Sequence, residues 1–158
     1  MKEPFLPSLS LEKIYVTPLV PQEDGTYRCL SFDEMQQVTM PQTGCALMDA
    51  VARTLATVPC RKGIEVADHL DVDLRKLSGA VDLYFGIGLN ELVIAYRTCL
   101  ASELVRLTQL SPEEVAKRCG LASTSTLMHL IKSQLNTTFF DLRKQSQQEV
   151  QKTFVVYK

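Results

Sequence analysis

The chain has 158 residues, of which 46% are hydrophobic, and its formal net charge is −1. This length suits one domain or a compact pair of small ones, and the apolar content is too high for a disordered chain. The near-neutral charge excludes a uniformly polybasic nucleic-acid binder. No apolar run approaches the ~18 residues of a membrane span and no signal peptide is visible, so we expect a cytoplasmic protein without membrane contact.

The charge is distributed unevenly along the sequence. Residues 1–60 hold four Lys and Arg against seven Asp and Glu, and residues 61–110 hold six against seven. Residues 111–158 reverse the balance, with seven basic residues against four acidic ones. A positive field that attracts phosphate is therefore expected in the last third of the chain.

The cysteines and histidines show no metal-binding pattern. The five cysteines are odd in number, no two have C-x-x-C spacing, and His69 and His129 do not pair with them at zinc-finger spacing. We therefore expect reduced thiols, no metal site and no cofactor. No Ser/His/Asp order, phosphate loop or paired carboxylate indicates an enzyme, so we expect no catalytic residues.

Proline distinguishes residues 1–44 from the rest of the chain, because five of the seven prolines fall in the first 41 residues. Within this segment, residues 14–17 and 26–30 are rich in β-branched and aromatic side chains, and residues 22–25 between them have turn chemistry. The pattern predicts a small N-terminal β-hairpin.

The edges of this hairpin are expected to need a partner. Pro18 and Pro21 would confine the first strand to an edge of the sheet, and an uncovered edge is a template for pairing. Residues 153–157 of the C-terminal tail have strand character. We expect the hairpin to pair with them, or to dock a second copy of the chain or another protein.

Helical periodicity begins at about residue 45. Apolar residues recur at three- and four-residue steps up to Pro59, which predicts a first helix. Residues 66–70 suggest a short second helix, and Asp73 can cap a third. An apolar stripe in residues 89–107 then predicts one long amphipathic helix of about five turns.

A second set of helices has clear boundary signals. Ser111 can cap a helix, Pro112 suits its first position and Glu114 completes a capping box. Gly120 can end this helix in the left-handed conformation, and Ser123 can cap the next one. A last short helix is expected at residues 139–144.

Each of these sets ends in a helix-turn-helix pattern, in which a short helix and a tight turn precede a capped second helix. In the later copy, Ala116 is small, so the second helix can cross close over the first, and Gly120 permits the sharp turn. The second helix then lies on the surface of the domain and can enter the roughly 12 Å wide major groove of DNA.

The pattern occurs twice, with a nearly constant offset. Val66-Ala67 corresponds to Val115-Ala116 at an offset of 49, and three later pairs correspond at an offset of 50. These pairs are Leu77 and Leu127, Val81 and Ile131, and Gly86 and Asn136. The one-residue difference falls in the turn, so the repeat indicates two copies of one supersecondary unit.

The predicted fold is therefore mainly α. Two helix-turn-helix three-helix units are joined by a long central helix, and a small β-hairpin segment precedes them. The expected ranges are 1–44 for the hairpin segment, 45–144 for the double helix-turn-helix domain (45–88, linker helix 89–108, and 111–144), and 145–158 for the tail.

On these residues the chain resembles the DNA-binding region of the AraC/XylS family of bacterial transcription regulators, over roughly residues 45–144. The positions that carry the resemblance are Leu77, Val81, Gly86, Leu92, Arg97 and Ala101 in the first half, and Ser111, Val115, Ala116, Gly120, Leu121, Ser123, Leu127, Ile131, Leu142 and Arg143 in the second. The resemblance implies double-stranded DNA binding, with reading helices at about residues 73–84 and 124–134 in successive major grooves.

The chain also departs from the family pattern. Family members usually carry a large effector-binding domain, for which the 44 residues before the helical region are too few. Gly79 occupies a position where members often have a long base-contacting side chain. Asp71, Asp73 and Asp82 surround the first reading helix and would repel phosphate.

Candidate DNA contacts lie on the outward sides of the two reading helices. They are Arg75, Lys76 and Ser78 on the first, and Ser123, Ser125, Thr126, His129 and Lys132 on the second. Hydroxyls and an imidazole can bond base edges, whereas Lys132 can bond a phosphate, and the helix end at Ser123 can face one. Arg97 and Arg143 are expected to tie helices together inside the domain.

Two functions remain open from the sequence. The first is a sequence-specific regulator of transcription that binds double-stranded DNA. The alternative is a degenerate helix-turn-helix protein that keeps the fold and uses its reading surfaces to bind protein. The acidic residues and Gly79 favour the alternative, and the basic last third of the chain opposes it.

Overall fold

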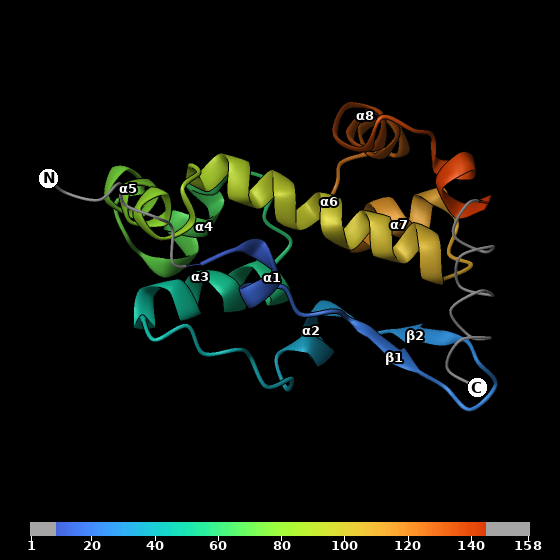
Figure 1. The fold of residues 1–158 in the computed structure, drawn as a ribbon, viewed down its shortest axis with the longest axis horizontal. Coiled ribbons are helices and arrows are strands. Elements are labelled where there is room, and N and C mark those ends of the chain that lie inside the picture. The colour runs from blue at the N-terminus through green and yellow to red at the C-terminus, as the bar shows by residue number, and fades with distance from the viewer. Residues whose placement is uncertain (1–8, 145–158) are drawn as a thin grey trace, which may run out of the picture. The chain divides into compact units, whose positions relative to one another are not determined.

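The computed structural model describes residues 9–144 of the chain. It divides into two compact units, which we describe separately (Figure 1). Among the described residues, unit 1 comprises 9–17 and 32–96, and unit 2 comprises 18–31 and 97–144.

Unit 1 is helical in its described residues. Its elements are α1 (Leu11–Ile14), α2 (Phe32–Met35), α3 (Ala46–Thr57), α4 (Gly63–Leu70), α5 (Leu74–Phe85) and the first part of α6 (Leu89–Leu107). Helix α4 packs against both α3 and α5 (Figure 1). Its core consists of fully buried side chains that include Ile14, Met35, Met48, Leu55, Leu77, Leu89, Leu92 and Tyr96.

Unit 2 combines a hairpin with the second set of helices. Its elements are β1 (Leu19–Pro21), β2 (Tyr27–Cys29), the rest of α6, α7 (Pro112–Arg118) and α8 (Thr124–Leu135), and residues 139–144 are helical as well. Its core includes Leu104, Val115, Leu127, Ile131 and Phe139, each with 0% of its surface exposed. The mainly α fold with a small hairpin confirms the predicted fold class.

The hairpin differs from the prediction in its first strand. Strands β1 and β2 are antiparallel, with Val20 opposite Arg28, and Gly25 in the connecting turn has φ 86°. The second strand lies within the predicted residues 26–30. The prediction of a strand at residues 14–17 is wrong, because β1 begins at Leu19.

Tertiary packing explains this difference. Ile14 ends helix α1 and is completely buried in unit 1. Tyr15 packs its ring against Tyr96 of α6 with 5.0 Å between centroids, and the amide of Val16 donates to the Tyr96 hydroxyl at 3.5 Å. Ile14 and Tyr15 therefore pack in the helical core of unit 1 and do not form a strand. The proposed strand at residues 153–157 lies outside the described residues.

The two helix-turn-helix turns have the same backbone hydrogen bonds. In unit 1 the amide of Val72 donates to the Ala67 carbonyl at 3.0 Å, and that of Asp71 to Asp68 at 3.2 Å. In unit 2 the amide of Leu121 donates to the Ala116 carbonyl at 2.9 Å, and that of Gly120 to Lys117 at 3.1 Å. Both sets form the Schellman arrangement, with a left-handed residue (Asp71, φ 53°, or Gly120, φ 73°) after the helix.

The second helices also begin and end alike. The Asp73 carboxylate accepts from the Lys76 amide at 3.1 Å, and the Ser123 hydroxyl accepts from the Thr126 amide at 3.2 Å. Both helices have 12 residues, and each is followed by a left-handed residue, Gly86 or Asn136. Every position of α5 therefore has an equivalent in α8 at the offset of 50 that the sequence predicted.

No single helix among residues 9–144 is long and apolar enough to cross a membrane, and only the bent pair of α5 and α6 matches such a span in length and composition.

Candidate nucleic-acid interface

Helix α8 presents a continuous polar face to solvent. We define its outer face as the exposed residues Ser125, Thr126, His129, Lys132 and Ser133. The opposite side of the helix is anchored by Leu127 and Ile131, which are fully buried. Because buried and exposed positions alternate at helical spacing, the outer face is held outward by the packing of the core side.

The N-terminus of α8 is engaged in capping. The Ser123 hydroxyl lies 3.2 Å from the Thr126 amide and 3.1 Å from the Thr126 hydroxyl. Two of the predicted contact residues are thus linked to each other, and Ser125 and His129 lie beside them on the exposed side. Ser133, four residues after His129, is absent from the contacts predicted from the sequence, although helical spacing alone places it on the same face.

Helix α7 packs against α8 and contributes side chains that are completely buried. Val115 and Cys119 have 0% of their surface exposed, and α7 and α8 pack against each other. Burial raises the pKa of the Cys119 thiol to about 12, although the nearby Arg97 and Arg118 act to lower it. Cys119 therefore remains a neutral thiol and serves as a core side chain.

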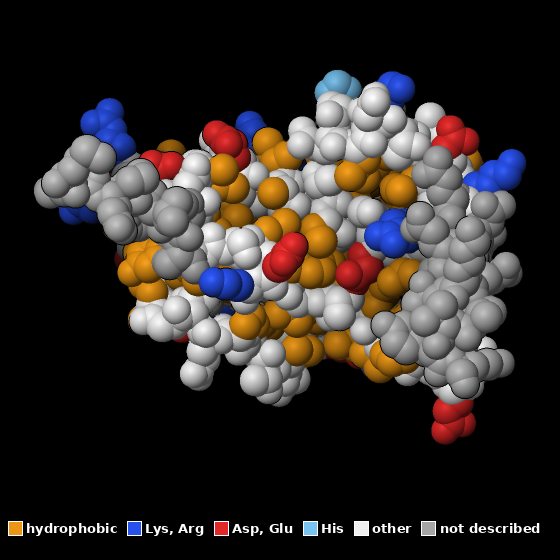
Figure 2. Space-filling view, in the orientation of Figure 1, with side chains coloured by type: hydrophobic (Ala, Val, Ile, Leu, Met, Phe, Trp, Pro, Cys, Tyr) orange, Lys and Arg blue, Asp and Glu red, His pale blue; other side chains and the backbone are white. Residues whose placement is uncertain are grey.

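The charge around α8 favours an anionic partner. Residues 115–140 contain no Asp or Glu, and the segment carries Lys117, Arg118 and Lys132. Figure 2 shows a histidine and a basic side chain projecting together above α8. Backbone amides at the start of α8 add the positive end of a helix dipole to this side.

Helix α5 has exposed positions equivalent to those of the α8 outer face, but the side chains at these positions differ. We define this α5 outer face as the exposed residues Arg75, Lys76, Gly79, Asp82 and Leu83. At the offset of 50, Gly79 corresponds to His129, Asp82 to Lys132 and Leu83 to Ser133. The positions that offer an imidazole, a cation and a hydroxyl on α8 therefore offer no side chain, an anion and an apolar group on α5.

Ser78, also predicted as a contact, lies beside this face and is half-buried. Its hydroxyl accepts a hydrogen bond from the Leu89 amide at 3.4 Å, which fixes the start of α6 against α5. The carboxamide oxygen of Asn90 accepts from the Gly63 amide at 2.7 Å, which fixes α4 in the same way.

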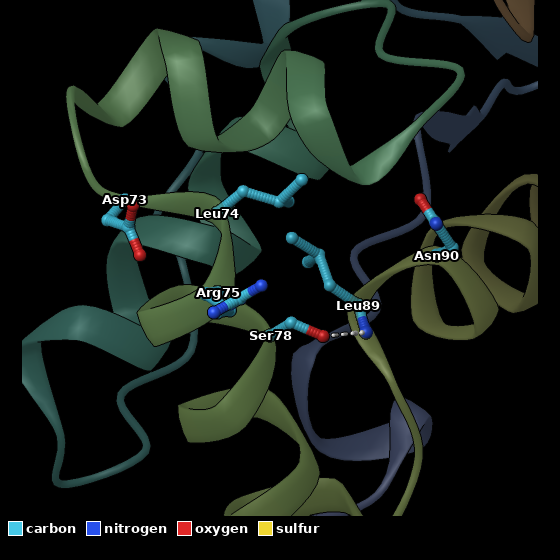
Figure 3. A pocket seen from close by; sticks show the side chains of 6 residues that line it. All are labelled: Asp73, Leu74, Arg75, Ser78, Leu89 and Asn90. Atoms are coloured by element: carbon cyan, nitrogen blue, oxygen red, sulfur yellow. Dashed lines mark hydrogen bonds between the residues drawn. The ribbon is translucent and has the colours of Figure 1, made fainter.

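A pocket of about 550 Å³ lies next to Ser78. It is lined by Asp73, Leu74, Arg75, Ser78, Leu89 and Asn90. Figure 3 shows the side chains of Leu74 and Leu89 pointing toward each other, with polar groups of the other residues around them. Its lining carries one carboxylate, that of Asp73, and one guanidinium, that of Arg75, so the charges do not single out an anionic or a cationic ligand.

Arg143 has the structural role that the sequence predicted. Its guanidinium donates to the Val105 carbonyl at 2.9 Å and to the Leu110 carbonyl at 2.7 Å, and lies 4.7 Å from the Phe139 ring centroid. It therefore ties residues 139–144 to the end of α6 and the following loop. Arg97, at 2% exposure, lies inside unit 2 and not on a nucleic-acid surface.

The described residues contain no group of three or more His, Cys, Asp or Glu side chains that could hold a metal ion. All five cysteines lie in the described part of the chain, and no disulfide joins any two of them.

No protein-family model matches the sequence, and no curated protein matches it significantly. Solved structures do match its fold. The C-terminal domain of AraT, a response regulator from Geobacillus stearothermophilus, has a TM-score of 0.56 and 22% identity, covering 63% of this chain and 84% of that domain. The DNA-binding domain of AdpA, a global transcriptional factor crystallised with a target DNA, has a TM-score of 0.58 and 23% identity, covering 65% and 94%.

A third match is a transcriptional regulator from Chromobacterium violaceum, described as containing an AraC-type DNA-binding domain. Its TM-score is 0.54 and its identity 22%, over 63% of this chain and 90% of that structure. All three are described as regulators or as domains of regulators. The chain therefore has the double helix-turn-helix fold of AraC-type DNA-binding domains, as the sequence resemblance implied.

Proposed function

We propose that this protein is a cytoplasmic, sequence-specific regulator of transcription that binds double-stranded DNA, and that α8 is its principal reading helix. The observation that carries this proposal is the α8 outer face. It combines hydroxyls, an imidazole and a lysine on the exposed side of a helix that follows a helix-turn-helix turn, and no acidic residue lies nearby in the sequence.

The chemistry of this face suits the major groove. Ser125, Thr126 and His129 offer donors and acceptors to base edges, and Lys132 offers a cation to a phosphate. The N-terminus of α8, next to Ser123, adds backbone amide groups, which favour the binding of an anion. The AdpA domain, which has the same fold, was crystallised in complex with a target DNA, and duplex DNA is therefore the natural class of partner to test.

Helix α5 is assigned a supporting role that does not depend on base sequence. Arg75 and Lys76 are exposed and can attract phosphate, whereas Ser78 is engaged with the Leu89 amide. Gly79 offers no side chain to a base, and Asp82 repels the phosphate backbone. Base recognition is therefore expected from α8, although the general resemblance implies one reading helix from each unit.

The first experiment measures the salt dependence of binding to duplex DNA by fluorescence anisotropy. Lys132→Glu is expected to weaken binding to all sequences alike and to flatten the plot of log K against log salt by a slope of about 1, the value for one phosphate contact. The matched control is Lys62→Glu, the same charge change at an exposed residue outside both outer faces. It should leave the slope close to that of the wild type.

An unchanged slope for Lys132→Glu would move the phosphate contact away from α8. The alternative function, a helix-turn-helix protein that binds another protein, is favoured by the composition of the α5 outer face. A gel shift against genomic fragments at low salt separates the two functions. Binding with a salt-dependent affinity supports the regulator, and the absence of any shifted fragment supports the interaction module.

A further inference from the structure

Arg118, the last residue of α7, connects the second helix-turn-helix to the N-terminal hairpin. Its Nε–H donates to the carbonyl of Leu30, the residue that follows β2, at 2.8 Å. The thiol of Cys29 in β2 donates to the same carbonyl at 3.6 Å. The hairpin therefore contacts the end of α7 within unit 2, through a hydrogen bond that joins residues 88 positions apart.

This contact lies directly before the turn that leads into α8. The two hydrogen bonds of the turn are donated by the amides of Gly120 and Leu121 to carbonyls in α7. Arg118 belongs to the same last turn of α7. Because only a few residues separate Arg118 from the start of α8, a movement of the end of α7 would change the position of α8.

The hairpin, α6 and α7 meet around the side chain of Cys119. Cys119 has 0% of its surface exposed, and its thiol interacts electrostatically with Cys29 of β2, Arg97 of α6 and Arg118. Arg97 is itself only 2% exposed. The bond between Arg118 and Leu30 is therefore partly shielded from water, which would otherwise replace it at little cost.

The equivalent position of the first helix-turn-helix has a different environment. At the offset of 49, His69 corresponds to Arg118, and its side chain is exposed. The hairpin belongs to unit 2 and α4 to unit 1. The contact with the hairpin therefore concerns the unit that carries α8, the proposed reading helix.

We propose that the hairpin, residues 18–31, takes part in DNA recognition, and that Arg118 positions α8 by fixing the end of α7 to Leu30. The proposal rests on the proposed function of α8. Arg118 is a positioning residue, because its Nε–H bonds the protein backbone. A lysine carries the same charge but has no N–H at this point of the side chain, so it does not reproduce the contact.

The first test is amide hydrogen exchange of the full chain without DNA, followed by NMR at Gly120 and Leu121. Arg118→Lys and Arg118→Met should each accelerate exchange at both amides by about tenfold or more, because the turn opens locally once a charge-assisted bond is lost. The amides of Asp71 and Val72, in the equivalent turn of unit 1, are the internal reference and should not change.

A substitution in the hairpin tests the same contact without altering α7. Gly25 has φ 86°, and a Cβ there would meet no atom within 4 Å. Gly25→Val strains the hairpin turn and should accelerate exchange at Gly120 and Leu121. The matched control is Gly44→Val, at an equally open position of unit 1 with φ 89°, which should leave both amides unchanged.

The second test measures binding to duplex DNA by fluorescence anisotropy. Arg118→Lys and Arg118→Met should both raise the Kd by about fivefold or more, because α8 is less well ordered before binding. The slope of log K against log salt should stay at the wild-type value in both variants, because no phosphate contact is lost.

Three results would overturn the proposal. Exchange at Gly120 and Leu121 could stay unchanged in the Arg118 variants, or it could accelerate equally at Asp71 and Val72, which would indicate a general loss of stability. Arg118→Met alone could lower the slope by about 1, which would make Arg118 a phosphate contact. A wild type that binds no duplex would overturn the proposed function, whereas the exchange results show separately whether the hairpin fixes the turn.

Discussion

Gly79 lies in the middle of α5 at an exposed position, where a Cβ would meet no atom within 4 Å. Gly79→Ala is therefore expected to stabilise the monomer by about 1 kcal/mol, the difference between the two residues in a helix interior. Urea unfolding at low protein concentration measures this change.

Gly63 provides the control for this substitution. A Cβ at Gly63 would lie 2.8 Å from the Asn90 side-chain oxygen and 2.9 Å from Leu89 Cγ. Gly63→Ala should therefore destabilise the protein by roughly 1–3 kcal/mol through overpacking. Equal effects of the two substitutions would show that the surroundings of these glycines are wrongly assigned.

The thiols of Cys119 and Cys45 should differ in reactivity and in their effect on stability. Burial raises the pKa of Cys119 to about 12, whereas the Met48 amide and then the Tyr84 hydroxyl lower that of Cys45. Because the thiolate is the reactive form, iodoacetamide should label Cys45 first at neutral pH and Cys119 only after unfolding. Peptide mass spectrometry reads both sites in one sample.

The raised pKa of Cys119 also predicts how the stability of the folded chain changes with pH. The unfolded chain loses the Cys119 proton at its ordinary pKa of 9.0, and the folded chain keeps it up to about 12. This contribution to stability is complete below pH 9 and is lost as the pH rises toward 12. Cys119→Ala should therefore flatten the decline in stability over that interval, and an unchanged decline would contradict the assignment.

The equivalent helix ends of α4 and α7 differ in one residue that matters for stability. Asp71 and Gly120 both follow a helix in the left-handed conformation, with φ of 53° and 73°. A side chain in this conformation costs roughly 1–2 kcal/mol, less for Asp than for most residues. Asp71→Gly should therefore stabilise the protein by up to about 1 kcal/mol, and Gly120→Ala should destabilise it. Thermal unfolding of the two variants checks the opposite signs.

At the same scale, local signals account for the elements that could be predicted from the sequence. Asp73, Ser111 and Ser123 cap their helices as predicted, because capping depends on the nearest few residues. The strand prediction for residues 14–17 is wrong because the burial of Ile14 in unit 1 depends on residues far along the chain. Strand propensity reports such an environment only weakly.

In the candidate site too, some features follow from local sequence and others depend on tertiary packing. The exposure of His129 and Lys132 follows from helical spacing and was predictable. The engagement of Ser78 with the Leu89 amide was not, because it depends on how α6 begins relative to α5. Gly79 and Asp82 were visible in the sequence as departures, but only the structure shows that the space around Gly79 is open.

The net charge of −1 is the sum over regions of opposite sign: the first helix-turn-helix has an excess of acidic residues and the second an excess of basic ones. Residues 61–91 hold six Asp and Glu, whereas residues 115–140 hold none. We therefore expect a polyanion to be attracted more strongly to the second helix-turn-helix than to the first.

The most direct test of the account is selection of binding sites from random duplexes, performed with the wild type, His129→Ala and Arg75→Ala. We predict that His129→Ala relaxes the preference at defined base positions, at a cost of about 1–3 kcal/mol for the preferred site. Arg75→Ala should select the same sequence as the wild type. A site made of two unlike blocks about one helical turn apart, with Arg75→Ala relaxing one block and His129→Ala the other, would show that both units read bases and would contradict the account.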